Sequence, residues 1–265
     1  MQKKVEYKKL TFFDNVFKPL VKGKKTFELL STSYTKKIKA SDKSIIFNNE
    51  GHGDMSLLAL INKVRRDGKA YDKMSCPGFV PQFDVFNIPD EDEVICKIDI
   101  KGAYWEYAKK MGLLSKDTID FFHGKYGNVD SKHSKSVRLK ALGSLATKKV
   151  VERYMLGVKY DSLTTIQMQD TRDIYMNIRS GIDTLIRRIC AQNPGVAYYY
   201  VDCIFVKKGK FADDARDYLL NSGYKVTTEE TRIKQVKIGD TIYLESAADD
   251  KRYLTRLTAL EDTYK

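Results

Sequence analysis

The chain has 265 residues, of which 42% are hydrophobic and 31% are charged. This apolar content is enough to build a sizeable core, so the composition excludes a wholly disordered chain. The formal net charge is +12 and aromatic residues make up 11%, a combination expected of a protein that binds a polyanion such as nucleic acid.

The cysteine and histidine patterns argue against disulfides and zinc sites. Cys76, Cys96, Cys190 and Cys203 show no CxxC spacing, and three of them lie in apolar segments. Buried, reduced thiols are therefore expected. No segment approaches the ~18 apolar residues of a membrane span, and the N-terminus lacks the apolar core of a signal peptide. The sequence predicts a soluble, cytoplasmic protein with no membrane partner.

The first 92 residues form a basic region whose role the sequence does not indicate. Within it, residues 44–48 predict a short strand and residues 55–66 an amphipathic helix. Residues 67–92 contain three of the five prolines and end in an acidic run. This segment predicts a loop that separates residues 1–92 from a main domain at residues 93–265.

From residue 93 onward, strands and helices alternate. The pattern predicts a strand at 94–100, helices at 103–111 and 116–122, and a long helix at 134–154. A further helix begins near Asp170 and ends at Asn193-Pro194-Gly195. Then follow a strand at 197–206, a helix at 211–220, a strand at 224–227 and a hairpin at 235–245. This order predicts an α+β domain, with a ferredoxin-like antiparallel sheet covered by helices on one face.

Two aspartates interrupt the apolar strands. Asp99 lies near the end of the first strand, and Asp202 lies between Val201 and Cys203 in another. A charge in such a strand must be solvated, paired or bound to metal, because burying it bare costs several kcal/mol. Carboxylates on neighbouring strands can hold two divalent cations about 3.5–4 Å apart, as phosphoryl transfer requires. A simple salt bridge is the alternative for either aspartate alone.

Four segments of the chain resemble motifs of family B DNA polymerases, especially the phage and protein-primed branch. Residues 99–104 (DIKGAY) are similar to the DxxSLYP motif, and residues 200–206 (YVDCIFV) to the DTDSxFV segment. Residues 138–148 resemble a KxxxNSxYG helix that has lost its tyrosine, and residues 250–253 a KKRY-type segment. The four occur in the family's order and span residues 94–254.

The resemblance implies a polymerase palm with short helical fingers at about 104–154 and a rudimentary thumb at about 233–265. Asp99, Asp202 and the carbonyl of Ile100 would bind Mg²⁺, or Mn²⁺ in its place. Tyr104 would pack under the sugar and exclude a 2′-hydroxyl. Tyr200 replaces the first aspartate of DTD, to which the resemblance assigns a supporting role.

The helix motif can be aligned in two registers. One puts Leu139 where the triphosphate-binding lysine belongs; the other puts Lys140 there, with Ser144 and Thr147 on the same helical face. We prefer the second, in which Lys135 and Arg138 also reach phosphate oxygens. A solvated basic helix is the alternative reading.

The resemblance predicts a nucleotidyltransferase, either a template-directed DNA polymerase or a primase-like enzyme. It would use dNTPs on a DNA primer-template, with an RNA template still open, and would act in the host cytoplasm if a phage encodes it. No exonuclease motif precedes Asp99, so proofreading is not expected, and an accessory protein is expected to aid processivity. Nucleic-acid contacts are predicted at Lys148, Lys149, Lys251 and Tyr253.

Two alternatives stay open at this stage. Residues 200–203 (YVDC) also resemble the YxDD box of reverse transcriptases with its second aspartate replaced, although no LPQG-like segment is present. The degenerate helix motif is compatible with a palm that has lost catalysis and serves as a nucleic-acid-binding or assembly subunit.

Overall fold

The chain is divided into two compact units, each built from two separate segments. The computed structural model describes residues 4–32, 35–49, 53–71, 83–86, 90, 93–127, 131–146, 148–166, 169–238, 241–246 and 252–254. Unit 1 contains Met1–Met74 and Leu114–Tyr175, and unit 2 contains Ser75–Leu113 and Met176–Lys265. The first crossing falls inside the proline-rich segment 67–92. Residues 114–175 return to unit 1, so the segment 104–154, expected to form the fingers of one domain, is divided between the units.

Unit 1 contains a six-stranded sheet among its described residues, in the order β1-β4-β3-β2-β7-β8. β1 and β4 pair in parallel and the other neighbours are antiparallel. The elements at this sheet are β1 (Lys4–Lys9), η1 (Leu10–Phe12), α1 (Phe13–Lys22), β2 (Phe27–Ser31), β3 (Lys36–Lys39), β4 (Lys43–Asn48), β7 (Lys148–Met155) and β8 (Val158–Ile166).

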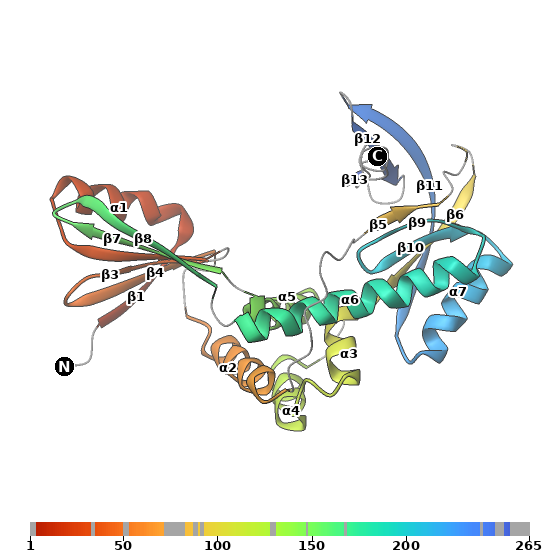
Figure 1. The fold of residues 1–265 in the computed structure, drawn as a ribbon, viewed down its shortest axis with the longest axis horizontal. Coiled ribbons are helices and arrows are strands. Elements are labelled where there is room, and N and C mark those ends of the chain that lie inside the picture. Colours follow the sequence, from red (N-terminus) through yellow and green to blue (C-terminus); the bar gives the residue numbers. More distant parts are fainter. Residues whose placement is uncertain are drawn as a thin grey trace. The chain divides into compact units, whose positions relative to one another are not determined.

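Helix α1 covers one face of this sheet (Figure 1). Alternate strand residues point toward it, because successive side chains of a strand lie on opposite faces. The core under α1 includes Phe13, Phe27, Phe47 and Tyr154, and the rings of Phe27 and Tyr154 stack at 4.6 Å between centroids. Since β2 and β7 are more than a hundred residues apart, this packing closes the unit over a long stretch of chain.

The helical part of unit 1 is organised around a buried carboxylate. It comprises α2 (Met55–Ala70), α4 (Lys116–Tyr126), α5 (Lys132–Gly143) and η2 (Ser144–Ala146). Asp67 of α2 accepts hydrogen bonds from the backbone N–H and hydroxyl of Ser115, at 2.9 and 2.8 Å, and from the Thr118 hydroxyl at 2.6 Å. Ser115 is also the N-cap of α4, accepting from the Thr118 N–H. These bonds fix the start of α4 against α2.

Unit 2 contains a seven-stranded sheet in the described residues, in the order β13-β12-β11-β6-β10-β9-β5. Each pair of neighbouring strands with a described register is antiparallel. Its elements are β5 (Phe83–Val85), β6 (Val94–Ile100), α3 (Ala103–Lys110), most of α6 (Gln169–Gln192), β9 (Val196–Tyr200), β10 (Cys203–Lys207), α7 (Lys210–Asn221), β11 (Val226–Ile238), β12 (Thr241–Ser246) and β13 (Arg252–Leu254).

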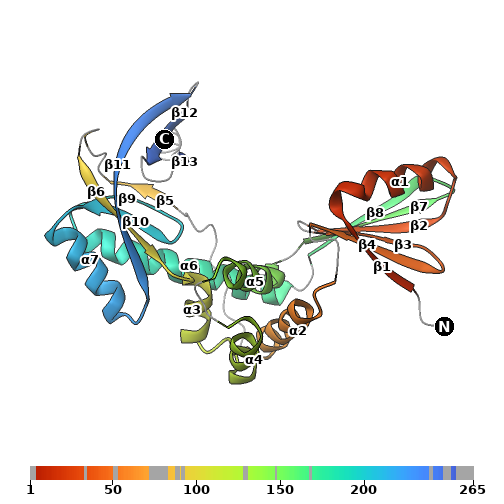
Figure 2. The same ribbon diagram turned by 180° about the vertical axis from the view of Figure 1, so that it is seen from behind.

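Helices α6 and α7 cover one face of the unit 2 sheet (Figure 2). The cluster beneath them contains Cys96, Ile98 and Ile100 of β6 together with three isoleucines of α6. A buried polar pair lies on the same side: the Tyr199 hydroxyl donates to Asp183 at 2.6 Å. The predicted α+β class with antiparallel sheets and helices on one face is therefore confirmed at that level for unit 2.

Two sequence predictions about elements were wrong. The long helix expected at 134–154 ends at Gly143, and the chain continues as β7, which pairs with β2 and β8. The strand expected at 197–206 is a hairpin of β9 and β10. In the segment from residue 233, predicted to be thumb-like, the described residues add β12 and β13 to the unit 2 sheet, and β11 and β12 form the hairpin predicted at 235–245. In the parts of the chain that the structure describes, none of the helices has the length and apolar character needed to span a bilayer.

Candidate active site

Asp99 lies on the central strand of unit 2, on the face away from α6 and α7. β6 pairs with β10 on one side and β11 on the other. Cys96, Ile98 and Ile100 point to the helix side, whereas Ile95 belongs to a second buried cluster with Tyr198, Cys203 and Phe205. Asp99 follows Ile95 by four residues and so lies on the same face of the sheet, and its side chain is half-buried.

Asp202 lies in a turn and not in the middle of a strand, which corrects the prediction. Val201 and Asp202 form the two-residue connection between β9 and β10, and Tyr200 pairs with Cys203 to close it. Two-residue hairpins favour turns with a positive φ, because their twist matches that of the strands. Val201 has φ 57°, an uncommon conformation for a β-branched residue. The backbone strain at Val201 therefore sits next to one of the two carboxylates.

The fold brings Asp99 and Asp202 together. Cys203 lies directly opposite Asp99 on the antiparallel pair of β10 and β6, so their Cα atoms are about 4.5–5.5 Å apart. The backbone N–H of Ile100 donates to the carbonyl oxygen of Asp202 at 3.0 Å. The two acidic residues, which are remote in sequence, thus occupy adjacent backbone positions.

The thiol of Cys203 responds to both carboxylates. Burial raises the pKa of this thiol, and the negative charges of Asp202 and Asp99 raise it further. The sulfur also lies 3.1 Å from the carbonyl oxygen of Tyr200, to which the thiol donates. Cys203 is therefore a neutral thiol at ordinary pH, placed between two acidic groups.

Sequence reasoning did not single out Lys97, which lies near these carboxylates. It precedes Asp99 by two residues on β6 and so shares its face of the sheet, and it is half-buried. Its positive charge acts to lower the pKa of the Cys203 thiol, against the effect of the aspartates. On β11, Glu229 lies opposite Lys97 and Thr227 lies opposite Asp99. The period of two along β6 could have indicated Lys97 from the sequence alone.

Tyr104 belongs to α3, which starts immediately after β6. Gly102 precedes the helix with φ 62°, a left-handed conformation that lets the chain turn sharply from the strand into the helix. Tyr104 is partly buried and packs against the cluster beneath α6 and α7. Its neighbour Trp105 is fully buried in the described structure.

The residues predicted to bind the triphosphate belong to unit 1, whereas Asp99, Asp202 and Tyr104 belong to unit 2. Lys135 is exposed on α5 and Lys140 is half-buried. Arg138 and Ser144, both predicted to contact the triphosphate, are buried. The Arg138 guanidinium is 5.8 Å from the ring centroid of Phe122, and only 6% of the residue is exposed.

Ser144 is buried at the end of α5, where its hydroxyl donates to the carbonyl oxygen of Ala141 at 2.6 Å. Lys140 and Ser144 do not lie on one continuous α-helix, because α5 ends at Gly143; Thr147, the third residue of the predicted stripe, lies outside the described residues. The short 3-10 segment after Gly143 turns the Ser144 side chain inward instead of leaving it on a phosphate-facing surface.

The predicted nucleic-acid contacts are only partly covered by the described residues. The backbone of Lys148 and Lys149 forms the start of β7 in unit 1. Tyr253 lies on β13 and pairs with Leu244, and Lys251 lies outside the described residues.

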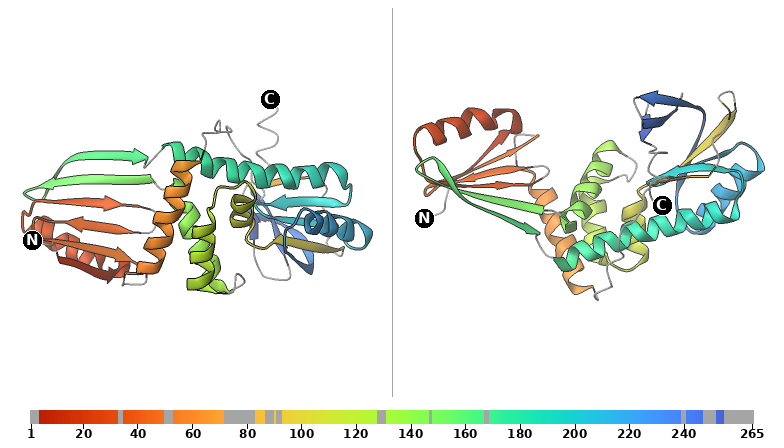
Figure 3. Two further views of the ribbon diagram at one scale, coloured as in Figure 1. Left: turned by 90° about the horizontal axis from the view of Figure 1, so that it is seen from below. Right: turned by 45° about the horizontal axis from the view of Figure 1, so that its top comes forward.

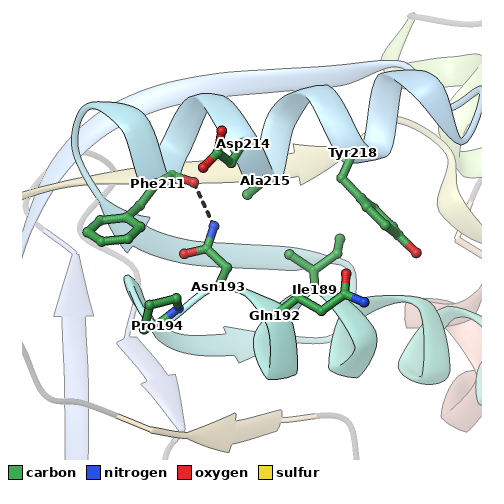
Figure 4. Close-up of a pocket in the computed structure, with 8 residues that line it drawn as sticks. All are labelled: Ile189, Gln192, Asn193, Pro194, Phe211, Asp214, Ala215 and Tyr218. Carbon is green, nitrogen blue, oxygen red and sulfur yellow. Dashed lines mark hydrogen bonds between the residues drawn. The ribbon is translucent and has the colours of Figure 1, made fainter.

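A cavity of about 250 Å³ lies on the opposite side of the unit 2 sheet from Asp99. Figure 4 shows its lining, which comes from the end of α6, from Asn193 and Pro194 directly after it, and from α7. Asn193 connects the two sides of this cavity. Its amide donates to the carbonyl oxygen of Phe211 at 2.7 Å, and its side-chain oxygen accepts from the Gly195 N–H. Neither aspartate of the candidate site lines this cavity.

The candidate site therefore consists of Asp99, Asp202 and the backbone of Ile100, with Lys97 and Cys203 beside them. Within the described part of the chain, no group of three or more histidine, cysteine or acidic side chains is arranged to hold a metal ion. Two carboxylates and backbone oxygens are the donors that this site can offer. No protein-family model matches the chain, and no curated protein matches it.

Proposed function

We propose that the chain is a nucleotidyltransferase that extends a nucleic-acid primer along a template, as a DNA polymerase or a primase-like enzyme. The observation that carries the proposal is the position of Asp202, in a hairpin turn whose next residue pairs with Asp99. Unit 2, an antiparallel sheet with helices on one face, would be the palm. The resemblance of residues 99–104 and 200–206 to polymerase motifs supports the same assignment.

The donor set fits a divalent cation that prefers oxygen. Mg²⁺ is usually bound by one or two carboxylates, with water and substrate phosphates completing its shell. Asp99, Asp202 and the carbonyl oxygen of Ile100 would hold it, and Mn²⁺ would bind the same oxygens. When bound, the metal would lower the pKa of the attacking hydroxyl and offset the charge of the phosphates.

In the proposed reaction, the primer 3′-hydroxyl oxygen forms a bond to the α-phosphorus of a dNTP. The bond from that phosphorus to the bridging oxygen breaks, pyrophosphate leaves and the hydroxyl proton passes to solvent. Asp99 and Asp202 would supply the negative charge that holds the metal, and Tyr104 at the start of α3 would discriminate against a 2′-hydroxyl. Contacts of Lys140 and Lys135 with the triphosphate stay predictions from the sequence.

Primer extension tests the proposal directly. Asp99→Asn and Asp202→Asn should each abolish incorporation of labelled dNTPs with Mg²⁺ or Mn²⁺, while binding of the primer-template changes little. Asp217→Asn, an exposed aspartate of α7 in the same unit, serves as the matched control and should keep full activity. Extension that persists in either site variant would show that these carboxylates are not catalytic.

Two arms of the same assay refine the substrate. Tyr104→Ala should increase incorporation of rNTPs relative to dNTPs, if the aromatic ring excludes the 2′-hydroxyl. Running DNA and RNA templates side by side separates a family B-like polymerase from a reverse-transcriptase-like enzyme.

A second function has specific support. Cys203, a neutral thiol, stands opposite Asp99, and Arg138 and Ser144 are buried within unit 1. These features differ from what the polymerase motifs lead one to expect of a catalytic palm. They favour a palm that binds nucleic acid or assembles with other proteins without catalysis. In that case no nucleotide is incorporated with either metal, whereas nucleic-acid binding persists and weakens steeply with salt.

A further inference from the structure

The net positive charge of the protein comes from one unit. Unit 1 contains 28 lysines and arginines and 15 acidic residues, whereas unit 2 contains 19 and 20. The whole net charge of +12 therefore comes from the unit that does not contain the two aspartates of the candidate site. An excess of this size in one compact unit attracts a polyanion to that unit in particular.

The face of the unit 1 sheet that α1 leaves open carries an unusual row of side chains. Figure 3 (left) views the sheet from this face, with α1 behind the strands. The strand registers align one residue from each of the six strands: Tyr7, Ile46, Lys37, Leu30, Val151 and Leu163. Each is half-buried or exposed, and Leu163 is 49% exposed. The open face of an antiparallel sheet is ordinarily polar, so an apolar row with a lysine at its centre indicates a binding surface.

The acidic residues of this face are neutralised within the sheet. A second row of side chains lies beside the first on the same face and is joined by ion pairs. The shortest nitrogen-to-oxygen distances are 3.3 Å from Lys39 to Glu28, 3.4 Å from Arg153 to Glu28 and 2.8 Å from Arg153 to Asp161. The hydrogen bond from Lys39 lowers the pKa of Glu28, so this carboxylate stays ionised and paired. Lys37 has Ile46 and Leu30 as its cross-strand neighbours, with no carboxylate directly opposite.

We propose that this open face of unit 1, centred on Lys37, Leu30 and Val151, binds single-stranded nucleic acid. Six strands about 4.8 Å apart make a surface about 24 Å wide, which accommodates several nucleotides. Apolar side chains contact the flat faces of unstacked bases, and lysines contact the phosphates. A duplex hides its base faces, so it matches this apolar row less well. The inference rests on the proposed function in taking nucleic acid as the ligand.

Fluorescence anisotropy with a labelled oligothymidylate, using the full chain, tests the surface. Lys37→Glu should weaken binding about tenfold, because it reverses a charge that faces the phosphates. Lys22→Glu makes the same charge reversal at an exposed position of α1, which covers the other face of the sheet. It should weaken binding only about twofold. Equal losses in the two variants would mean that the unit attracts the strand without using this face.

A second pair of variants tests the apolar contacts. Leu163→Ser should weaken binding severalfold, whereas Leu139→Ser, at an equally exposed position of α5 in the same unit, should not. Circular dichroism and urea unfolding of each variant show that the fold is kept. Equal affinities of these two variants, or an affinity for duplex that matches the affinity for oligothymidylate, would overturn the assignment.

The test is independent of catalysis, because it needs neither metal nor nucleotide. Asp99→Asn should bind oligothymidylate as the unmodified chain does. If Asp99→Asn still extends primers while Lys37→Glu loses binding, the proposed active site fails and the surface stands. If Asp99→Asn abolishes extension while Lys37→Glu binds normally, the surface fails and the active site stands.

Discussion

The backbone N–H of Ile100 donates a hydrogen bond of 3.0 Å to the carbonyl oxygen of Asp202, joining the end of β6 to the turn between β9 and β10. Asp99 precedes the donor residue in the chain, and Asp202 provides the accepting carbonyl oxygen. The relative position of the two aspartates is therefore set by the main chain. Backbone positions held by sheet hydrogen bonds shift less than flexible side chains do. Side-chain substitutions at either aspartate should therefore remove its charge without moving its partner.

The first prediction concerns the turn at Val201. Because a β-branched residue is strained at φ 57°, Val201→Asn should raise the free energy of unfolding by about 1 kcal/mol. Val206→Asn, at a fully buried position of β10, should lower it by about 3 kcal/mol. Urea unfolding measures both. A loss of stability in Val201→Asn would mean that burial of the valine outweighs the strain.

The second prediction concerns stability at alkaline pH. The folded state raises the pKa of the Cys203 thiol above its ordinary value of 9.0, so it binds the proton more tightly than the unfolded chain. The stabilisation is complete below pH 9.0 and is lost as the pH rises above it. Burial raises the pKa of Tyr126 and Tyr224 to about 12, in the same direction.

Urea midpoints should therefore stay level from neutral pH to 9.0 and fall above it, and Cys203→Ala should show a shallower fall. Asp99→Asn should also make it shallower, because it removes one of the charges that raise the pKa of the thiol. A Cys203→Ala chain with an unchanged pH profile would contradict the assignment to this thiol.

The third prediction concerns the contact between α3 and α6. A Cβ atom at Gly181 would lie 2.0 Å from the ring of Tyr107, so Gly181→Ala should destabilise the chain by about 1–3 kcal/mol. In a Tyr107→Ala background the same change should stabilise it by about 1 kcal/mol, because alanine is the better helix former. Thermal unfolding of the four chains gives the coupling energy. Simple additivity would show that the ring moves aside without cost.

The fourth prediction concerns the buried carboxylate of unit 1. Asp67 is 8% exposed and accepts three hydrogen bonds through a single oxygen, from Ser115 and Thr118. Asp67→Asn should lower the free energy of unfolding by about 1–3 kcal/mol, because a neutral amide oxygen accepts more weakly than a carboxylate and the amide NH2 would face Arg66, which lies 3.5 Å from the other carboxylate oxygen. Asp120→Asn, on the exposed side of α4, is the control and should change it by less than about 0.5 kcal/mol.

The sequence predicted elements well where apolar periodicity was strong and the ends carried a signal. The helix ending before Asn193-Pro194 and the strand containing Asp99 both lie where expected. The hairpin at residues 201–202 was missed because its turn contains valine and no glycine or asparagine. In residues 1–40, the lysines of β1 and β3 concealed the apolar pattern of these strands, and β1 and β2 each pair with a strand that is distant in the sequence.

For the candidate site too, local sequence signals predicted only part of what the structure shows. The two aspartates were found because each interrupts an apolar segment, and the sheet brings their positions together. The phosphate-binding stripe could not be predicted reliably, since the fate of Ser144 depends on where α5 ends. The helix ends at Gly143 and the chain continues as β7, whose pairing with β2 is a tertiary contact that the periodicity of this segment does not show.

The interleaved chain segments of the two units also set an order for biosynthesis. Strand β2 keeps an open edge on the nascent chain until the ribosome has released β7, more than a hundred residues later. During that interval the exposed N-terminal strands are open to pairing with other chains. A chain that terminates between residues 74 and 148 never acquires β7, so the edge of β2 stays unpaired. Such fragments should aggregate and depend on chaperones.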